Sequence, residues 1–432
     1  MSTFPRAVFL SLLAMAAPTC VHGESLSDAW RMALQSDGSL AAVQSARTAA
    51  EDDQRAASRM RWPVVDVTGT YTKLQASPYL DIETAAGRLQ SPKIWSNDRY
   101  AMGSVEMSIP LWTSGRISGT IDAAQAGARG AGAQEIRGVS DLKLAVAEAY
   151  VGVFRGRAAA NVANSNVASL KAHADDVQVM FDREAVAQSD LLAAKVALAN
   201  ALQQQLRATN GLRIATAAYN RFVGQPMDRA PDLDAPAASA SQSGTGSLAG
   251  LVKTAEAQRP ELAALAAQQE AYDAAARAER AQGLPQIGLR AGVTHMDNQI
   301  LDRQDFASIG VGFQSRLFDS GQVSARVSAL RNRARGTGQQ LADLRSHIAL
   351  EVESTVLNRD DAAARLRVTG EAVVQSEENL RLAKELYGSG LGTNTQVLDA
   401  ESLRVMALTN RDSASFDLII AEYRVRRALG EL

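Results

Sequence analysis

The side chains that most often perform catalysis or bind metals are few and scattered in this sequence. Beyond residue 23 the histidines are His173, His295 and His347, and their spacing does not match that of metal ligands. Cys20 is the only cysteine, so the sequence after it offers no thiol. No glycine-rich phosphate loop follows a strand, and no Gly-x-Ser-x-Gly motif occurs. We therefore expect no enzyme activity, no metal and no cofactor.

Two stretches, Tyr100–Gly115 and Phe306–Gly321, share one pattern. In each, apolar and polar residues alternate, and this period of two predicts a β-strand with one apolar and one polar face. Each strand ends in a Leu-aromatic pair followed by Ser-Gly, and a long proline-free segment comes next. The junction residues are Trp112, Ser114 and Gly115 in the first copy and Phe318, Ser320 and Gly321 in the second. The pattern predicts a strand that leads into a long helix, twice.

Two further alternating segments complete a set of predicted strands. The set lies at 64–74, 100–112, 286–296 and 306–318. Residues 75–99 contain Pro78, Gly87 and Pro92 and are predicted to form a loop. His295 falls on the apolar register of its strand, which favours an interface position over a catalytic one.

Helices are predicted between the strands. Residues 26–61 should be helical, with an interruption at Gly38 and Ser39 and a stop at Trp62-Pro63. The proline-free run from Gly115 to Gly224 has one expected turn, near 183–189. Its first helix would be roughly 100 Å long at the α-helical rise. Its apolar residues form a seam for a neighbouring helix, at Leu142, Val146, Ala149 and Val153.

The second half of the chain repeats the first. Leu248 and Leu262 stand 222 residues after Leu26 and Leu40, and an offset of 206 then relates the remainder, as in the pair Phe181 and Tyr387. We therefore expect a first repeat at 24–224, a Pro/Ser/Gly/Ala-rich linker at 225–247 and a second repeat at 248–432.

The first 23 residues are expected to be a secretory signal peptide. Arg6 precedes an apolar run at 7–17 that is too short to span a bilayer, and small residues permit cleavage before Glu24. Thr19 before Cys20 fits a lipoprotein signal poorly. After this segment no apolar stretch is long enough for a transmembrane helix. The net charge of −2 gives no basic footprint for nucleic acid.

Four strands of about ten residues have the length that crosses a bilayer when they are tilted. Four strands cannot close a barrel, and an open strand edge is not tolerated in lipid. A membrane barrel would therefore need two, three or four copies of the chain arranged cyclically. The polar faces would then line a lumen, and aromatic residues at the strand ends would be candidates for an interfacial girdle or for packing at the strand–helix corner.

The sequence resembles the TolC-like outer-membrane factors of Gram-negative efflux and type I secretion systems. The resemblance covers 24–432 and depends on the duplicated halves, the Leu-aromatic-x-Ser-Gly junctions and the stretch Tyr387–Glu401. It implies an α+β fold, in which a homotrimer forms a 12-stranded transmembrane β-barrel continued by a periplasmic α-helical coiled-coil tunnel. It also implies outer-membrane lipid around the barrel, and a periplasmic adaptor and an inner-membrane transporter as partners.

The resemblance also implies a gate at the ends of the helices far from the membrane. It places Asp399 on the inner side of the second turn, while the earlier acidic position is Gln396. A ring of Asp399 carboxylates would attract cations. The alternatives are a solvated helix carboxylate for Asp399 and a capping box between Gln396 and Thr393. The helix tips expected to contact the adaptor include Phe181, Arg183, Gly390, Gly392 and Thr393.

The resemblance further implies a latch between the helices. Ser189-Asp190 matches an acidic position in the first turn, and Tyr387 matches the hydroxyl that reaches it, so we expect a Tyr387–Asp190 hydrogen bond. The alternative for Asp190 is a carboxylate that complements the helix dipole behind Ser189 as N-cap. Gly392 stands where some family members carry a basic latch residue, which weakens the expectation of a tightly latched gate.

A different class of protein is compatible with part of the pattern. A periplasmic coiled-coil scaffold or adaptor could contain the same helices, with the alternating segments forming a small soluble β-domain. Strand length, duplication and the lack of other core-forming segments favour the membrane barrel. The sequence does not identify the cargo, the adaptor or the pump.

Overall fold

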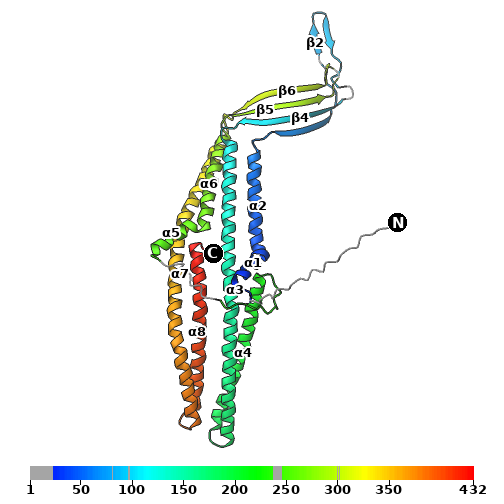
Figure 1. Ribbon diagram of the computed structural model, residues 1–432. Coiled ribbons are helices and arrows are strands. Elements are labelled where there is room, and N and C mark those ends of the chain that lie inside the picture. The colour runs from blue at the N-terminus through cyan, green and yellow to red at the C-terminus, as the bar shows by residue number, and fades with distance from the viewer. Residues whose placement is uncertain (1–22, 80, 96–97, 237–245, 299, 301) are drawn as a thin grey trace, which may run out of the picture. The chain divides into compact units, whose positions relative to one another are not determined.

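The computed structural model describes residues 23–79, 81–95, 98–236, 246–298, 300 and 302–432. The expected signal peptide at 1–23 lies outside the described residues except for Gly23, and so does the middle of the expected linker at 225–247. Helices and strands follow in the order α1, α2, β1, β2, β3, β4, α3, α4, α5, α6, β5, β6, α7, α8 (Figure 1).

The described residues fall into two compact units. We call the first, the described residues within 23–36, 145–236 and 362–420, the helical unit. The second, the described residues within 37–144, 246–361 and 421–432, is the sheet unit. Each unit takes segments from both sequence repeats, so the repeats do not correspond to separate compact units.

The helices recur in pairs of similar length. Their bounds are α1 Leu26–Ser36, α2 Gly38–Arg59, α3 Arg116–Asp182, α4 Gln188–Phe222, α5 Leu248–Gln258, α6 Pro260–Ala281, α7 Gln322–Gly388 and α8 Asn394–Leu429. Helices α3 and α7 have 67 residues each, and α2 and α6 have 22 each. The expected interruption near Gly38 is a real break, because the Asp37 side chain caps α2 by accepting from the Leu40 N–H at 2.9 Å.

Each unit has its own apolar core. In the helical unit, residues of α3, α4, α7 and α8 form one buried cluster that includes Val177, Leu191, Leu380 and Val397. In the sheet unit, α5, α6, α7 and α8 enclose another around Ile348. The predicted seam of α3 is largely confirmed, since Leu142, Val146 and Val153 are buried and Ala149 is half-buried. None of the described helices is both long enough and apolar enough to span a membrane.

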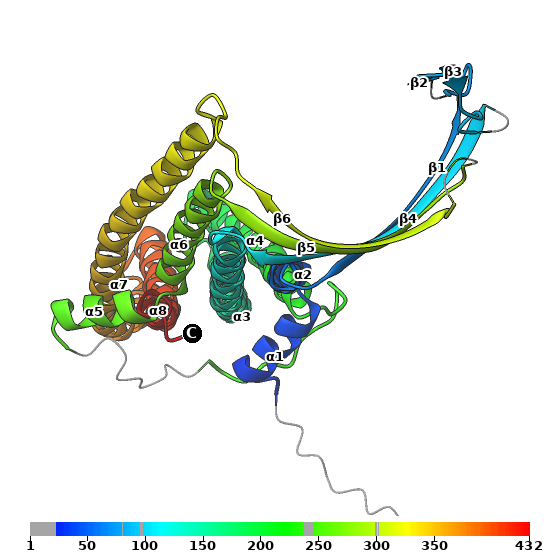
Figure 2. The same ribbon diagram turned by 90° about the horizontal axis from the view of Figure 1, so that it is seen from above.

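One curved four-stranded sheet lies in the sheet unit (Figure 2). Its strands are β1 Val64–Lys73, β4 Arg99–Trp112, β5 Gln286–Met296 and β6 Asp305–Gln314. They pair antiparallel in the order β1-β4-β5-β6, so β1 and β6 form its edges. The central pair, β4 and β5, joins strands that are far apart in the sequence.

The structure corrects the expected loop at 75–99. Its middle forms a hairpin of β2 Asp81–Thr84 and β3 Gly87–Gln90 (Figure 1). Ile82 pairs with Leu89, and Gly87 adopts a φ of 121° at the tight turn. The prediction of a loop from the prolines and the glycine holds near the ends of the segment. It missed the hairpin, whose strands have only four residues each.

The structure also shortens the fourth strand. We expected it to run to Phe318, but β6 ends at Gln314, and Leu317 and Phe318 follow it in irregular backbone. The last pair in the β5–β6 ladder is Gln286 with Gln314. Pro285 precedes Gln286 and has no backbone N–H, so the ladder cannot continue past it. In the first copy, by contrast, Trp112 is still within β4.

Candidate functional site

The sheet has one continuous apolar face. The register places Val67 beside Val105, Val105 beside Val293 and Val293 beside Ala307. Side chains on this face are largely exposed in the part of the chain that the structure describes: the exposed fraction is 78% for Val67, 77% for Ile309 and 70% for Phe313. A contiguous apolar surface of this kind requires an apolar environment or a partner.

The opposite face of the sheet is polar. Asp66 pairs with Glu106, and Thr68 pairs with Ser104. The Arg290 guanidinium lies 3.6 Å from the Glu106 carboxylate on the adjacent strand. Both side chains are largely exposed, so this ion pair contributes little stability. The alternation along each strand therefore separates an apolar surface from one suited to water.

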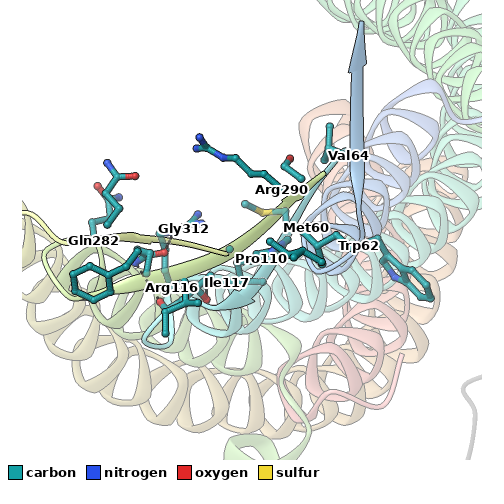
Figure 3. A pocket seen from close by; sticks show the side chains of 18 of the residues that line it. Met60, Trp62, Val64, Pro110, Arg116, Ile117, Gln282, Arg290 and Gly312 are labelled. Carbon is teal, nitrogen blue, oxygen red and sulfur yellow. Dashed lines mark hydrogen bonds between the residues drawn. The ribbon is translucent and has the colours of Figure 1, made fainter. Parts of the chain in front are cut away.

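A cavity of about 810 Å³ lies where the strands meet the helices (Figure 3). Its lining includes Met60, Pro110, Arg116, Gln282 and Arg290. The Trp62 and Arg290 side chains project in opposite directions, so the junction carries an aromatic side chain on one side and a charged one on the other (Figure 3).

The two strand–helix junctions have the same backbone conformation. Ser114 and Gly115 have φ values of 52° and 93°, and Ser320 and Gly321 have 54° and 82°. Successive left-handed residues redirect the chain from strand to helix, and glycine adopts this conformation without strain. The Ser114 hydroxyl also donates to the Pro285 carbonyl at 2.5 Å, which ties the first junction to the start of β5.

Different side chains cap the two helices that follow these junctions. The Asp319 carboxylate accepts from the Gly321 and Val323 N–H groups at 2.9 and 2.8 Å, and these backbone bonds lower the pKa of Asp319. At the equivalent place Thr113 accepts from the Ile117 N–H at 3.4 Å. Trp112 and Phe318 are both exposed beside these caps.

The first helix turn lies between Asp182 and Gln188. Glu184 has a φ of 58°, and the Ala185 N–H donates to the Met180 carbonyl at 2.9 Å, which closes the end of α3. Phe181 is half-buried and packs on the core of the helical unit, whereas Arg183 is exposed.

The predicted role of Ser189 as N-cap is wrong. Helix α4 starts at Gln188, so Ala187 is the N-cap and provides no side-chain hydrogen bond. The prediction chose Ser189 because its hydroxyl can accept a hydrogen bond from the helix N-terminus. The alanine at the true N-cap position has no side-chain acceptor. Asp190 lies in the first turn of α4, where its charge complements the helix dipole.

The second helix turn is built differently. Gly390 has a φ of 77°, and the Leu391 N–H donates to the Leu386 carbonyl at 2.9 Å. The predicted capping box is confirmed: the Thr393 N–H donates to the Gln396 side chain at 2.9 Å, and the Gln396 N–H donates to the Thr393 hydroxyl at 3.3 Å. A side-chain carbon at Gly392 would lie 3.0 Å from the Tyr387 nitrogen, so this position has little room.

The proposed gate residues lie on the exposed surface of α8. Asp399 and Gln396 are three residues apart and therefore share a helix face. Both Gln396 and Asp399 are exposed in the single chain, whereas Val397 and Ala400 beside them are buried. Gln396 is also engaged in the capping box, so its side chain has a structural role at this turn.

The expected Tyr387–Asp190 hydrogen bond is not formed. Within the described part of the chain the Tyr387 hydroxyl has no hydrogen-bond partner, although the residue is only 8% exposed. Burial raises the pKa of Tyr387, and the nearby charge of Asp190 raises it further. The two residues are thus neighbours without a direct bond, since the Tyr387 ring packs in the apolar core.

A buried contact that the sequence analysis missed lies beside Tyr387. His173 Nε2 lies 2.7 Å from Asn394 Oδ1, and Asn394 Nδ2 donates to the Asp190 carbonyl at 3.0 Å. A signal was present: His173 belongs to the same buried stripe of α3 as Leu170, Ala174 and Val177. A histidine on such a stripe needs a partner across the core.

A sheet with an exposed apolar face, joined to long paired helices, is the arrangement expected of an outer-membrane channel protein. Residues 251–431 match the family described as outer membrane efflux protein. The chain is 22% identical to the outer membrane protein TolC of Vibrio cholerae over 98% of this chain and 95% of that protein. It is 26% identical to the alkaline protease secretion protein AprF of Pseudomonas aeruginosa, over 68% of this chain and 62% of that protein.

Solved structures share the fold. VceC of Vibrio cholerae aligns with a TM-score of 0.79 at 18% identity, over 94% of this chain and 96% of that one. CusC aligns with a TM-score of 0.81 at 16% identity, over 94% and 92%. The chain therefore shares the fold of these outer-membrane channels, and its second half matches the outer membrane efflux protein family.

Proposed function

We propose that this protein is the exit duct of a tripartite efflux or type I secretion system, gated at its periplasmic helix turns. The observation that supports this most directly is the four-stranded sheet with one bare apolar face and one polar face. Lipid would cover the first face and water would fill the space along the second. Its relatives include proteins named for efflux and for alkaline protease secretion. We expect no catalytic activity.

The sheet edges support assembly from several copies. Among the described residues β1 pairs only with β4, and β6 pairs only with β5. Unpaired strand edges are costly in lipid, so β6 of one copy would pair with β1 of the next. In a homotrimer, three sheets would close a 12-stranded barrel, with the helices continuing it as a tunnel in the periplasm.

Bare apolar residues on the helices support the same arrangement. Helix α4 exposes Leu192, Val196, Leu206 and Ile214, and α7 exposes Leu350, Leu357, Val368 and Val374. Coiled-coil seams of this kind are normally covered by a neighbouring helix. In the proposed tunnel, helices of adjacent copies would cover them.

The helix turns would form the gate and the contact with the partners. Three copies would bring their Asp399 carboxylates around the axis, where they would attract cations and disfavour anions. The exposed Arg183 and the turn residues Gly390, Gly392 and Thr393 would meet a periplasmic adaptor. The adaptor would connect the duct to an inner-membrane transporter.

The native mass of the detergent-extracted protein, corrected for bound detergent, tests the proposal. We expect three chains per particle, and discrete ion conductance after reconstitution into planar bilayers. A monomer that leaves the membrane with salt alone, without detergent, would instead favour a periplasmic scaffold and would overturn the duct.

A further inference from the structure

The two helical hairpins, α3 with α4 and α7 with α8, meet at a buried polar contact. His173 is 5% exposed and Asn394 is 3% exposed, and they come from α3 and α8. The Asn394 amide also reaches the Asp190 carbonyl of α4. One asparagine side chain therefore links three helices at the turn end of the helical unit, where both turns lie side by side (Figure 1).

The hydrogen-bond pattern defines which atoms donate. Because Asn394 Nδ2 donates to a carbonyl, Asn394 Oδ1 is the acceptor toward His173, and His173 Nε2 must carry the proton. Tyr387 packs edge-on against the His173 ring, with ring centroids 5.4 Å apart, and so orients that ring. The structure thus gives both the orientation of the His173 ring and the direction of the hydrogen bond to Asn394.

A second polar layer lies one helical turn further along α3. The Ser169 hydroxyl donates to the Glu401 carboxylate at 2.8 Å, and Lys384 Nζ donates to Ser169 at 2.8 Å. Arg404 pairs with the buried Glu401 at 2.5 Å. This layer joins α3, α7 and α8, so the hairpins share two successive sets of polar contacts.

The sequence repeat does not duplicate the His173–Asn394 contact. Positions related by the offset of 206 are Asn379 for His173 and Gln188 for Asn394, and both are exposed. The pair therefore belongs to one particular contact between the hairpins and does not follow from helix packing in general.

We propose that His173 and Asn394 form the clasp that holds the two hairpins together in the state seen here. This inference rests on the proposed function, in which separation of the hairpins opens the gate. Breaking the pair inside the core would leave two buried polar groups without partners, whereas water would satisfy both once the hairpins part. The clasp thus favours either complete closure or full separation. The apolar Tyr387 environment supports the clasp by fixing the His173 ring.

The test compares single-channel conductance in planar bilayers for three variants: His173→Phe, Asn394→Leu and the double variant. In each single variant the remaining polar side chain is buried without its hydrogen-bond partner, which destabilises the closed state. We therefore expect the fraction of time that the channel is open to rise about tenfold. The double variant should open no more than Asn394→Leu alone, because Asn394→Leu already removes the bond that His173→Phe removes, together with the bond to the Asp190 carbonyl. The clasp would be overturned if the single variants kept the wild-type open fraction. It would also be overturned if the rise in open fraction of the double variant equalled the product of the rises in the two single variants.

His173→Gln is the matched control. Its amide nitrogen can reach the position of Nε2 and donate to Asn394, so we expect wild-type conductance, whereas His173→Phe keeps the ring and loses only the donor. Glu261→Gln supplies a second control, since it weakens a buried ion pair with Arg427 in the sheet unit. It should lower stability without changing the open fraction. A higher open fraction in either control would refute the specific role of the bond.

Hydrogen exchange at the turn amides, measured on the same samples, separates two kinds of failure. If wild-type protein forms no channels, the proposed function fails, and exchange still reports whether the variants part the hairpins. If wild-type protein conducts and the exchange rates at both turns stay unchanged in His173→Phe, the clasp fails and the duct stands.

Discussion

The two helix turns occupy equivalent places in the repeat, but they are stabilised in different ways. The second turn has Gly390 at its left-handed position and a complete capping box from Thr393 and Gln396. The first has Glu184 at the corresponding left-handed position, and Ala187 caps α4 without a side-chain bond. The first turn therefore lacks most of the local stabilisation that the second one has.

The first turn compensates by using the second hairpin. The Asn394 side chain of α8 donates to the Asp190 carbonyl in the first turn of α4, and Val186 packs against the shared core. We infer that the second hairpin would keep its turn if the two parted, whereas the first would loosen. The predictions that follow test this difference at the level of single residues.

The largest effect is expected from Gly392→Ala. A new side-chain carbon would lie 3.0 Å from the Tyr387 nitrogen and 3.1 Å from the Leu386 carbonyl carbon. Backbone atoms cannot move aside easily, so the second turn should lose about 1–3 kcal/mol, measured as faster hydrogen exchange at its amides. Gly388→Ala, which has no atom within 4 Å of the added carbon, is the control. Equal exchange rates in the two variants would contradict the steric account.

The next largest effects are expected from two opposite substitutions at the left-handed positions of the two turns. Gly390→Ala places a side chain at a φ of 77°, and Glu184→Gly removes one from a φ of 58°. The left-handed conformation costs a residue with a side chain about 1–2 kcal/mol. Local opening of the second turn should become easier, and that of the first turn harder. Hydrogen exchange of each turn would show this, and changes of the same sign in both would refute the comparison.

Capping changes should have a smaller effect. Gln396→Ala removes the acceptor of the Thr393 N–H, and Ala187→Ser supplies α4 with the hydroxyl that it lacks. Each should change the stability of its own turn by about 0.5–1 kcal/mol, in opposite directions. The measurement is the exchange rate of the first-turn amides of α8 and α4. No gain in stability in Ala187→Ser would contradict the view that the missing side-chain cap weakens the first turn.

The smallest effect is expected from Tyr387→Phe. The removed hydroxyl has no partner in the described structure, so stability near neutral pH should change by less than about 0.5 kcal/mol, and conductance should stay at the wild-type value. The folded-state pKa of Tyr387 is raised above its ordinary value of 10.0. Wild-type protein should therefore lose stability as the pH rises past that ordinary value, and the variant should lose less. If this variant opened the channel more often than wild type, the result would support the Tyr387–Asp190 latch after all.

Sequence periodicity predicted the sheet better than the turns. The alternation from Ser104 to Ser108 was sufficient to place β4 and to separate its two faces, because the side-chain period of a strand is fixed. The capping box of Thr393 and Gln396 was also readable, since its partners are three residues apart. Both features depend on local geometry.

The features that were missed depend on neighbours distant in the sequence. The shortened β6 reflects Pro285, which directly precedes the strand that pairs with it, and the contact of His173 with Asn394 joins positions 221 residues apart. Ser189 lost its predicted role because α4 starts earlier than local propensity indicated. No single window of sequence contains both partners of such contacts.

The unpaired edges of the sheet have a consequence for genetics. If three copies share one barrel as proposed, a chain with a defective β6 edge spoils every particle that it enters. In a cell that makes normal and defective chains in equal amounts, random mixing would leave only about one trimer in eight entirely normal. A missense allele at this edge should therefore behave as dominant, whereas an allele that prevents synthesis of the chain should be recessive.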